Sequence, residues 1–327
     1  MTDQKKKPPL KPTKTDNFFN LDPENVLVAA ELAGFEPTGL FTQLNSYENR
    51  VFDIRMENNE SLIAKFYRPG RWNYSAISEE HDFLQELNQD DIPCLQPLIL
   101  SNNSTIIEHQ GIYVSFFPKF KGRMPQELLE PDFNRLGQLL ARVHNVGARK
   151  EAPHRPYMDT SYYGGWQTLN TLQNLITPEV RTRYLNAAEN ILDFIDAEFD
   201  PSEFIRIHGD CHKGNVLQHE NLFYLVDFDD FANGPIIQDF WMLFNYNHDT
   251  LQKEKDLLVE GYEMFREFPF HQWDWVEALR GLRIIMYAGW IAKRWSDPSF
   301  PKLFPDFGSY SYWAEETEAL EKIAWSL

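Results

Sequence analysis

The first third of the chain shows the two-residue alternation of apolar and polar positions that is typical of β-strands. This alternation is clearest at 50–56 (RVFDIRM) and 61–67 (SLIAKFY), and the turn-forming residues 57–60 (ENNE) between them predict a β-hairpin. Two more strands are predicted at 105–110 (TIIEHQ) and 112–117 (IYVSFF). This part of the chain is therefore expected to form a small antiparallel sheet.

Helical spacing, with apolar residues recurring every three or four positions, dominates the rest of the chain. It is clearest at 133–147, 178–199 and 275–295, and it also occurs at 75–89. We therefore predict a bilobal α+β fold, with a small antiparallel-sheet lobe followed by a larger, mainly helical lobe. The chain crosses between the lobes near residues 116–120, and a cleft at this crossover is the expected ligand site.

Composition and charge narrow the classes of partner. Asp and Glu outnumber Lys and Arg by 49 to 31, so the formal net charge is −18. This excess argues against nucleic acid and anionic membranes as partners, since both attract positive charge.

The sequence also indicates where the protein is located. Two cysteines cannot form a disulfide framework. The apolar run 284–292 is too short to span a bilayer, and the basic start lacks a signal peptide's apolar run. We expect a cytoplasmic monomer in which the Lys- and Pro-rich residues 1–16 form a disordered arm.

Polar residues able to do chemistry are concentrated in the stretch RIHGDCHKGNVLQHENLFYLVDFDD. A short apolar strand (204–207) leads into a loop with the spacing H-x-D-x-x-x-x-N, and a second apolar strand (222–227) ends on an aspartate. If these two strands form a hairpin, Asp210, Asn215 and Asp227 lie together at one end of it.

Phosphoryl transfer uses such a set of oxygen atoms. One carboxylate accepts the proton of the attacking hydroxyl, while an amide and a second carboxylate hold Mg²⁺ against the phosphates. The alternative is a polar turn in which the Asp and Asn side chains bond to their own backbone. Because an apolar strand ending in Asp follows so closely, we favour phosphoryl transfer.

Lys65 and Glu80 form a second candidate pair. Lys65 lies in the middle of the predicted strand 61–67, where a lysine is commonly a surface residue, but Glu80 falls on the apolar face of the predicted helix 75–89. An unpaired carboxylate there is costly, and an ion pair with Lys65 satisfies both groups. Glu79 is the alternative partner, but helical geometry points it about 100° away.

The segments HGDCHKGN (208–215) and VDFDD (226–230) resemble the phosphotransferase family that includes aminoglycoside phosphotransferases and choline kinases. Within this family, LNSYENRVF, KFYRPGRW and RWSDPSFPKLFP are similar to a bacterial branch of stress-response Ser/Thr protein kinases. The resemblance runs from about residue 40 to 315. It implies a protein-kinase-like fold with a nucleotide-binding lobe at 17–117 and a catalytic lobe, including the substrate-binding helices, at 118–327.

The resemblance also implies roles at the reacting phosphate. Asp210 is expected to be the catalytic base, and Asn215 and Asp227 are expected to hold Mg²⁺, with Asp227 also counted as catalytic. The chain has Asp229 where the D-F-G motif has glycine, and this residue is either a second metal contact or, as we favour, a solvated carboxylate. His212 occupies the place of a phosphate-contacting lysine, with the adjacent lysine as its rival.

A further set of residues is expected to bind ATP, the co-substrate that this resemblance implies. Lys65 is expected to contact the α- and β-phosphates with Glu80 as its partner, and Ser46 to contact ATP from a loop that lacks the usual glycines. The backbone around Phe116 and Phe117 is expected to bond the adenine. The alternative for these two side chains is core packing, which we expect for at least one of them.

Four residues near these motifs are assigned other roles. His208 is expected to bond backbone beneath the catalytic loop, Asp239 to tie that loop down, and His144 to be a satisfied core residue. Cys211 adjoins the candidate base, but no cation is predicted beside it, so the sequence gives no basis for a redox role.

Three functions agree with these residues. The first is an ATP- and Mg²⁺-dependent Ser/Thr protein kinase with a protein acceptor. The second is the same chemistry on a small alcohol such as an aminoglycoside, choline or a homoserine-like compound, because the motifs at the phosphates do not separate the two acceptors. The third is a catalytically inactive nucleotide-binding scaffold, supported only by the missing glycines. Similarity along the whole chain favours the protein kinase.

Overall fold

The computed structural model describes residues 14–19, 21–161, 163–246 and 249–327. Most of the predicted arm, residues 1–13, lies outside the described residues. The chain divides into two compact units, one made of Met1–Gln85 with Leu95–Lys121 and the other of Glu86–Cys94 with Gly122–Leu327. Each unit buries its own set of apolar side chains.

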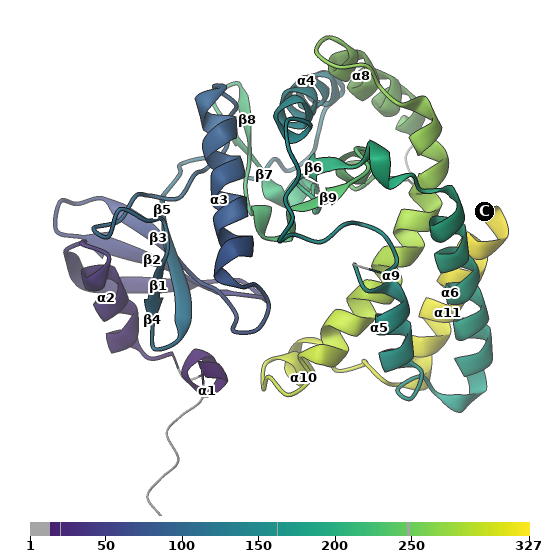
Figure 1. Ribbon diagram of the computed structural model, residues 1–327, viewed down its shortest axis with the longest axis horizontal. Helices are drawn as coiled ribbons and strands as arrows, with labels where there is room; N and C mark the ends of the chain where they lie inside the picture. Colours follow the sequence, from purple (N-terminus) through teal and green to yellow (C-terminus); the bar gives the residue numbers. More distant parts are fainter. Residues whose placement is uncertain (1–13, 20, 162, 247–248) are drawn as a thin grey trace, which may run out of the picture. The chain divides into compact units, whose positions relative to one another are not determined.

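The first unit is built on a five-stranded antiparallel sheet with the order β1-β2-β3-β5-β4 (Figure 1). The predicted hairpin is confirmed as β2 and β3, in which Asp53 pairs with Ile63. Strand β1 is an edge strand with mostly exposed residues, which explains why apolar alternation did not reveal it. The strands are β1 (Pro37–Leu44), β2 (Arg50–Met56), β3 (Ser61–Phe66), β4 (Ile107–His109) and β5 (Ile112–Pro118).

Alternate strand residues form the core of this unit. Phe52 and Ile54 of β2 and Ala64 and Phe66 of β3 are buried in one apolar cluster. Helix α2 (Pro23–Leu32) packs against β1 and adds its own buried side chains to the same cluster. The sheet is therefore a stable support for the loops at its ends.

Helix α1 (Lys14–Phe19) shortens the predicted arm, because the last three residues assigned to the arm are helical. Phe18 is fully buried, and the guanidinium groups of Arg50 and Arg68 lie 5.2 and 4.9 Å from its ring centroid. Ring burial and cation–π attraction offset the conformational entropy lost when this segment is ordered.

Helix α3 (Tyr74–Gln89) matches the helix predicted at 75–89. Its N-terminus is capped by the side chain of Asn73, which accepts a hydrogen bond from the Ala76 N–H at 2.8 Å. Ile77 and Leu84 are buried on the same face as Glu80, as their spacing predicts. The boundary between the two units falls within this helix, at Glu86.

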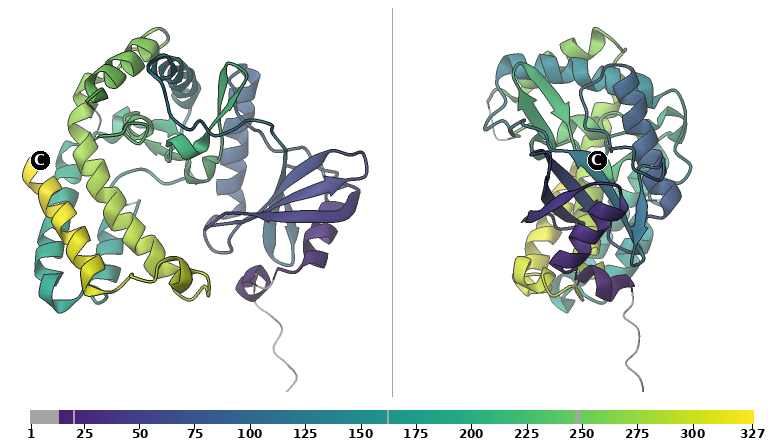
Figure 2. Two further views of the ribbon diagram at one scale, coloured as in Figure 1. Left: turned by 180° about the vertical axis from the view of Figure 1, so that it is seen from behind. Right: turned by 90° about the vertical axis from the view of Figure 1, so that its left-hand side faces the viewer.

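The second unit is mainly helical, and the three long helices predicted there are confirmed to within a few residues. Helices α6, α9 and α11 pack side by side (Figures 1 and 2). Within the described parts of the chain, no helix combines the length and the apolarity that crossing a membrane requires. The helices are α4 (Glu130–Gly147), α5 (Gly165–Leu172), α6 (Pro178–Glu198), α7 (Gln238–Trp241), α8 (Leu251–Glu263), α9 (Val276–Lys293), α10 (Phe300–Leu303) and α11 (Tyr310–Ser326).

Two short antiparallel ribbons complete the second unit, and they correct the predicted hairpin. Strand β6 (Ile205–Ile207) pairs with β9 (Ala232–Gly234), whereas β8 (Leu222–Leu225) pairs with β7 (Val216–His219). The predicted direct pairing of 204–207 with 222–227 is therefore wrong. The sequence reasoning overlooked β7, which is only four residues long and mixes apolar with polar side chains.

Glycines allow helices α4 and α8 to approach each other closely. A Cβ atom added to Gly261 of α8 would lie 2.0 Å from the carbonyl oxygen of Asn134, and one added to Gly137 of α4 would lie 2.0 Å from that of Leu258. Both distances are far inside van der Waals contact, so a side chain at either position must push the helices apart.

We predict that Gly261→Ala lowers the free energy of unfolding by about 3 kcal/mol, at the upper end of what overpacking costs, because the clash is with backbone. Urea denaturation followed by circular dichroism measures this change. Glu260→Ala, at the exposed neighbouring position of α8, is the matched control and should leave the midpoint nearly unchanged. Equal midpoints for the two variants would contradict the close packing.

Candidate active site

The loop between β6 and β7, residues 208–215, carries two of the predicted site residues, and a buried carboxylate fixes its backbone. The Asp239 Oδ2 atom accepts the His208 N–H and its Oδ1 atom accepts the Gly209 N–H, both at 2.8 Å. Asp239 belongs to α7 and is fully buried. Its predicted role in tying down the loop is confirmed by these contacts.

His144 of α4 completes the environment of Asp239. Its Nε2 atom lies 3.1 Å from Asp239 Oδ2, and its Nδ1 atom lies 3.0 Å from the Tyr262 hydroxyl. Burial lowers the pKa of His144, so the neutral ring donates from Nε2 to the carboxylate and accepts from the tyrosine. His144 is a satisfied core residue, as predicted.

Gly209 is the turning point of the loop. Its φ of +82° is a left-handed conformation, and a Cβ there would lie 2.2 Å from the carbonyl oxygen of Asp230. Gln238 of α7 donates from Nε2 to the Gly209 carbonyl at 2.8 Å. The backbone immediately before Asp210 is thus held on both its N–H and C=O sides.

Asp210 and Asn215 contact each other within this loop. The Asn215 Nδ2 atom donates to the Asp210 carbonyl oxygen at 2.9 Å and lies 3.5 Å from Asp210 Oδ2. Because both contacts use the amide nitrogen, the Oδ1 atom of Asn215 is turned away from Asp210. That oxygen is the atom through which an asparagine ligates a cation.

Asp227 reaches the same region from the end of β8. The Val226 N–H donates to the Asn215 carbonyl oxygen at 3.0 Å, and the Val226 carbonyl lies 3.0 Å from His208 Nε2. His208 therefore bonds backbone beneath the loop, as predicted. Asp227 itself has φ 61° and ψ 66°, a left-handed conformation that is uncommon outside glycine and is frequent at functional sites. The β7–β8 ribbon, rather than the predicted hairpin, brings the Asn215 and Asp227 ends of the chain together.

Arg283 of α9 is a neighbour of Asp210 that the sequence analysis missed. Its Nη1 atom donates to Asp210 Oδ1 at 2.8 Å. The other carboxylate oxygen, Oδ2, lies 3.4 Å from His212 Nε2. Burial alone would raise the pKa of Asp210, but His212 and Arg283 outweigh it and hold the pKa at about 2. The sequence contains no motif around Arg283 that could have indicated this contact, because only the path of α9 creates it.

Asp229 is buried, which corrects the preference for a solvated carboxylate. Its side chain belongs to a short 3₁₀ turn, Phe228–Asp230, and only 4% of the residue is exposed. Arg155, also fully buried, donates from Nη2 to the Asp229 carbonyl at 2.5 Å and from Nε to the Phe231 carbonyl at 2.7 Å. The turn that follows Asp227 is therefore held from within the unit.

Cys211, His212 and Lys213 follow Asp210 in the loop and differ in their contacts. His212 accepts the Gly214 N–H at Nδ1, at 2.9 Å, so its Nε2 atom carries the proton and faces Asp210. Lys213 donates to the Gln126 carbonyl at 2.8 Å. Cys211 is buried, and burial raises the pKa of its thiol, which disfavours the reactive thiolate.

In the first unit, the predicted ion pair between Lys65 and Glu80 is present. The Lys65 Nζ atom lies 3.6 Å from Glu80 Oε1 and 4.9 Å from the ring centroid of Tyr67. Both side chains are buried, with 9% and 1% exposure. A buried ion pair is retained only when each charge has a partner, so this pair fixes the Lys65 ammonium at a defined place on β3.

Ser46 lies in the loop between β1 and β2, and an arginine holds that loop in place of glycines. Arg68 donates from Nε to the Glu48 carbonyl at 2.9 Å and from Nη2 to the Tyr47 carbonyl at 3.2 Å. The Asn49 side chain accepts the Arg68 N–H at 3.1 Å. Side-chain hydrogen bonds therefore fix the backbone next to Ser46, whereas a glycine-rich loop would leave that backbone free to adapt.

Phe116 and Phe117 differ in their surroundings on β5. Phe116 is fully buried, its ring lies 5.1 Å from that of Phe35, and its carbonyl accepts the Leu98 N–H at 2.7 Å. Phe117 is half-buried, with its ring 6.2 Å from that of His81. The expectation that at least one of these two side chains packs in the core holds for Phe116.

The donor set at the end of the β7–β8 ribbon suits a hard cation that is shared with a ligand. Among the described residues, no three His, Cys, Asp or Glu side chains are grouped so as to hold a metal ion by themselves. Mg²⁺ does not require such a group, because it commonly takes one or two carboxylates and completes its shell with water and substrate phosphates. Asn215 and Asp227 fit this second kind of site.

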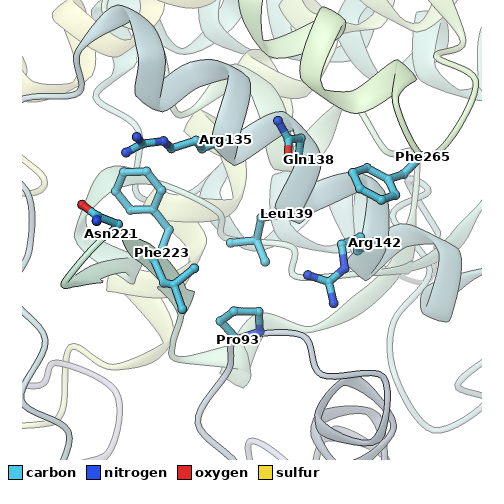
Figure 3. A pocket seen from close by; sticks show the side chains of 9 residues that line it. Pro93, Arg135, Gln138, Leu139, Arg142, Asn221, Phe223 and Phe265 are labelled. Atoms are coloured by element: carbon cyan, nitrogen blue, oxygen red, sulfur yellow. The ribbon is translucent and has the colours of Figure 1, made fainter.

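A separate pocket of about 210 Å³ lies in the second unit (Figure 3). None of its lining residues belongs to the 208–215 loop, and Leu139 and Arg142 extend into it from α4. Arg142 donates to the carbonyls of Asp90 and Asp91 at 3.0 and 2.9 Å, so its guanidinium closes one wall. The lining residues are Pro93, Arg135, Gln138, Leu139, Arg142, Asn221, Leu222, Phe223 and Phe265.

Comparison with known proteins agrees with this geometry. The model of the phosphotransferase enzyme family matches residues 41–278. The chain is 34% identical over 302 residues to stress response kinase A of Escherichia coli O157:H7, and 34% identical over 304 residues to the serine/threonine protein kinase RdoA of Salmonella typhimurium. Each alignment covers 92% of this chain and 92% of the relative.

Solved structures show the same fold at low sequence identity. An amicoumacin kinase in complex with AMP-PNP, Ca²⁺ and "Ami" has a TM-score of 0.76 and 19% identity, covering 92% of this chain and 93% of that one. A spectinomycin phosphotransferase in complex with ADP and spectinomycin has a TM-score of 0.67 and 14% identity, covering 93% and 98%. A microcompartment-associated aminopropanol kinase has a TM-score of 0.64 and 19% identity, covering 92% and 94%. The predicted kinase-like fold is confirmed.

We predict that Asp239→Asn loosens the 208–215 loop. The backbone N–H groups of His208 and Gly209 and the His144 ring all donate to Asp239. The amide has one acceptor oxygen in place of two, so at least one of these three donors would face the new NH₂ group, at a cost of about 1–3 kcal/mol. Hydrogen exchange at the His208 and Gly209 amides should accelerate, and the urea midpoint should fall. Asp193→Asn, on the exposed face of α6, is the control. Unchanged exchange at both amides would show that Asp239 does not hold the loop.

Proposed function

Because the chain belongs to the phosphotransferase enzyme family and is a kinase, we propose that it transfers the γ-phosphate of ATP to Ser or Thr hydroxyls of a protein, with Mg²⁺. The observation that carries this proposal is the grouping of Asp210, Asn215 and the Asp227 end of β8 around one buried loop support. The protein acceptor is supported by the relatives named stress response kinase A and serine/threonine protein kinase RdoA, each aligned over 92% of the chain.

Asp210 is proposed as the base. Its carboxylate stays ionised at neutral pH because the pKa is held at about 2, and it orients the attacking hydroxyl before accepting its proton late in the transfer. A carboxylate with such a low pKa is a weak base, so orientation of the hydroxyl is its larger contribution. Gly209 and Asp239 hold the loop in the conformation that this orientation needs.

The proposed nucleotide contacts are given for each unit by itself. Lys65, fixed by Glu80, pairs with the α- and β-phosphates, Ser46 donates to the phosphates from its loop, and backbone near Phe116 and Phe117 bonds the adenine. Asn215 and Asp227 would hold Mg²⁺, which neutralises charge on the phosphates when it is bound. The amicoumacin kinase structure, with its ATP analogue and divalent Ca²⁺, supports a nucleotide and a divalent cation.

A small alcohol is the second candidate acceptor, and the solved neighbours favour it. Their printed names describe kinases of amicoumacin, spectinomycin and aminopropanol. These neighbours are at most 19% identical to the chain, so they support the fold and the phosphate chemistry more strongly than the acceptor. The relatives with protein-kinase names are 34% identical, which is why we place the protein acceptor first.

Transfer of label from γ-labelled ATP tests the proposal. With Mg²⁺ and generic protein acceptors, the native chain should label Ser or Thr. Asp210→Asn should bind Mg·ATP normally, and its rate of labelling should fall by a factor of about 100 at least. Asp256→Asn, exposed on α8, is the matched control and should label at the native rate. Turnover that appears only when amino alcohols or aminoglycosides are added would replace the protein acceptor with a small one. Binding without any turnover would indicate a scaffold.

Removal of the proposed metal ligand gives an independent test. Asp227→Ala should abolish the strengthening of ATP binding by Mg²⁺ while leaving the metal-free affinity nearly unchanged, because the carboxylate acts on the nucleotide only through the cation. Titration of a fluorescent ATP analogue at several Mg²⁺ concentrations measures the difference. An Mg²⁺ dependence equal to that of the native chain would remove Asp227 from the metal site.

A further inference from the structure

Arg283 contacts the proposed base from a distant part of the chain. It lies on α9, 73 residues after Asp210 in the chain, and its Nη1 atom donates to Asp210 Oδ1 at 2.8 Å. The Arg283 side chain is 44% exposed, so it stays accessible from solvent while one of its five N–H donors contacts the carboxylate. The second Asp210 oxygen lies 3.4 Å from His212 and 3.5 Å from the Asn215 amide nitrogen.

This arrangement constrains the chemistry of any acceptor. A hydroxyl that hands its proton to Asp210 must come within about 2.6–3.2 Å of the carboxylate. The atoms next to that hydroxyl then lie within a few ångströms of the Arg283 guanidinium. A cationic substituent at this place would be repelled, while a carboxylate or phosphate could accept two parallel N–H bonds, the geometry that arginine favours.

The charges along α9 distinguish Arg283 from the other basic residues of the helix. Glu277 is its acidic residue, in the first turn, and it pairs with Arg280 at 2.7 Å. From Ala278 to Lys293 the helix has three basic residues and no acidic one, in a chain with a net charge of −18. Arg280 is neutralised by Glu277, and Lys293 lies about 15 Å further along the helix than Arg283, so Arg283 is the basic residue of α9 that an acceptor beside Asp210 would meet.

We infer that Arg283 is a specificity-determining residue that selects Ser or Thr hydroxyls with an anionic group beside them, carried by an acidic or already phosphorylated neighbouring residue of a peptide. The inference rests on the proposed protein-kinase function. It separates this chain from kinases of cationic acceptors, because a guanidinium beside the base disfavours an ammonium group in the same place.

A simpler role for Arg283, holding Asp210 in position, makes a different prediction. A positioning residue affects all acceptors alike, so its loss lowers the rate for acidic and neutral peptides by the same factor. A residue that binds the acceptor changes their ratio. The ratio of kcat/KM values between peptides therefore distinguishes selection from positioning.

The experiment uses the full chain with Mg·ATP and peptides that contain one serine in a neutral frame of alanine and glycine. The residues beside the serine are glutamate, phosphoserine, glutamine or lysine. The native chain should prefer the glutamate and phosphoserine peptides over the glutamine peptide by about 10- to 100-fold, the range expected for a hydrogen-bonded charge pair. The two anionic peptides together show which source of negative charge is read.

Substitutions of Arg283 and a matched arginine complete the design. Arg283→Gln should remove the preference, Arg283→Lys should restore part of it, and Arg283→Glu should shift it toward the lysine peptide. Arg280→Gln, with the same loss of charge one turn earlier on α9, should keep the native preference. Binding of a fluorescent ATP analogue by each variant verifies that the protein is folded.

The outcomes separate this inference from the function it rests on. If the native chain labels peptides without preferring anionic neighbours, or if Arg283→Gln keeps the native ratio, Arg283 does not select the acceptor and only this inference is overturned. If the native chain binds Mg·ATP but labels no peptide, the protein-kinase function is overturned and the inference with it.

Discussion

The hydrogen bonds of the buried Asp239 carboxylate are the interaction on which the 208–215 loop depends. Two consecutive backbone N–H groups and the His144 ring donate to its two oxygens, so a charge that would be very costly alone is fully hydrogen-bonded. The contact joins α4, α7 and the end of β6 at one point. Asp210 then projects from a fixed backbone, and Arg283 and His212 contact its two carboxylate oxygens.

Arginines perform the corresponding task elsewhere in the molecule by donating to pairs of main-chain carbonyls. Arg206 of β6 binds the carbonyls of Val146 and Gly147 at the end of α4, at 2.8 and 3.3 Å, and pairs with Glu86 at 2.7 Å. Arg68, Arg142 and Arg155 each bind two nearby carbonyls in the same way. The rigid fork of the guanidinium suits two neighbouring acceptors, which lysine cannot match. Helix ends and turns are thus closed from inside each unit.

The contrast between these two kinds of contact explains what the sequence could predict. The Lys65–Glu80 pair and the role of Asp239 followed from a polar residue placed on an apolar face or before an apolar helix, because the cost of burying that group demands a partner. The long helices and the β2–β3 hairpin followed from apolar periodicity. Arginine–carbonyl contacts leave no such signal, since every residue has a carbonyl. For the same reason the burial of Asp229 and the anchoring of the Ser46 loop could not be predicted. The approach of Arg283 to the Asp210 carboxylate was missed because only the path of α9 creates it. Strand β7 was overlooked because four mixed residues show no clear alternation, and with it the true partner of β8.

The anchoring of the Ser46 loop bears on the proposed binding of ATP phosphates by this loop. A glycine-rich loop follows the phosphates because its backbone is free to adapt, and it loses conformational entropy when it closes on them. Here Arg68 already bonds the carbonyls of Tyr47 and Glu48, and Asn49 bonds the Arg68 backbone, so much of that entropy is lost on folding. A loop positioned in advance gives up adaptability but binds with a smaller ordering cost. The missing glycines were the one feature that favoured an inactive scaffold. Because Arg68 and Asn49 position the loop in their place, the absence of glycines no longer argues for a scaffold.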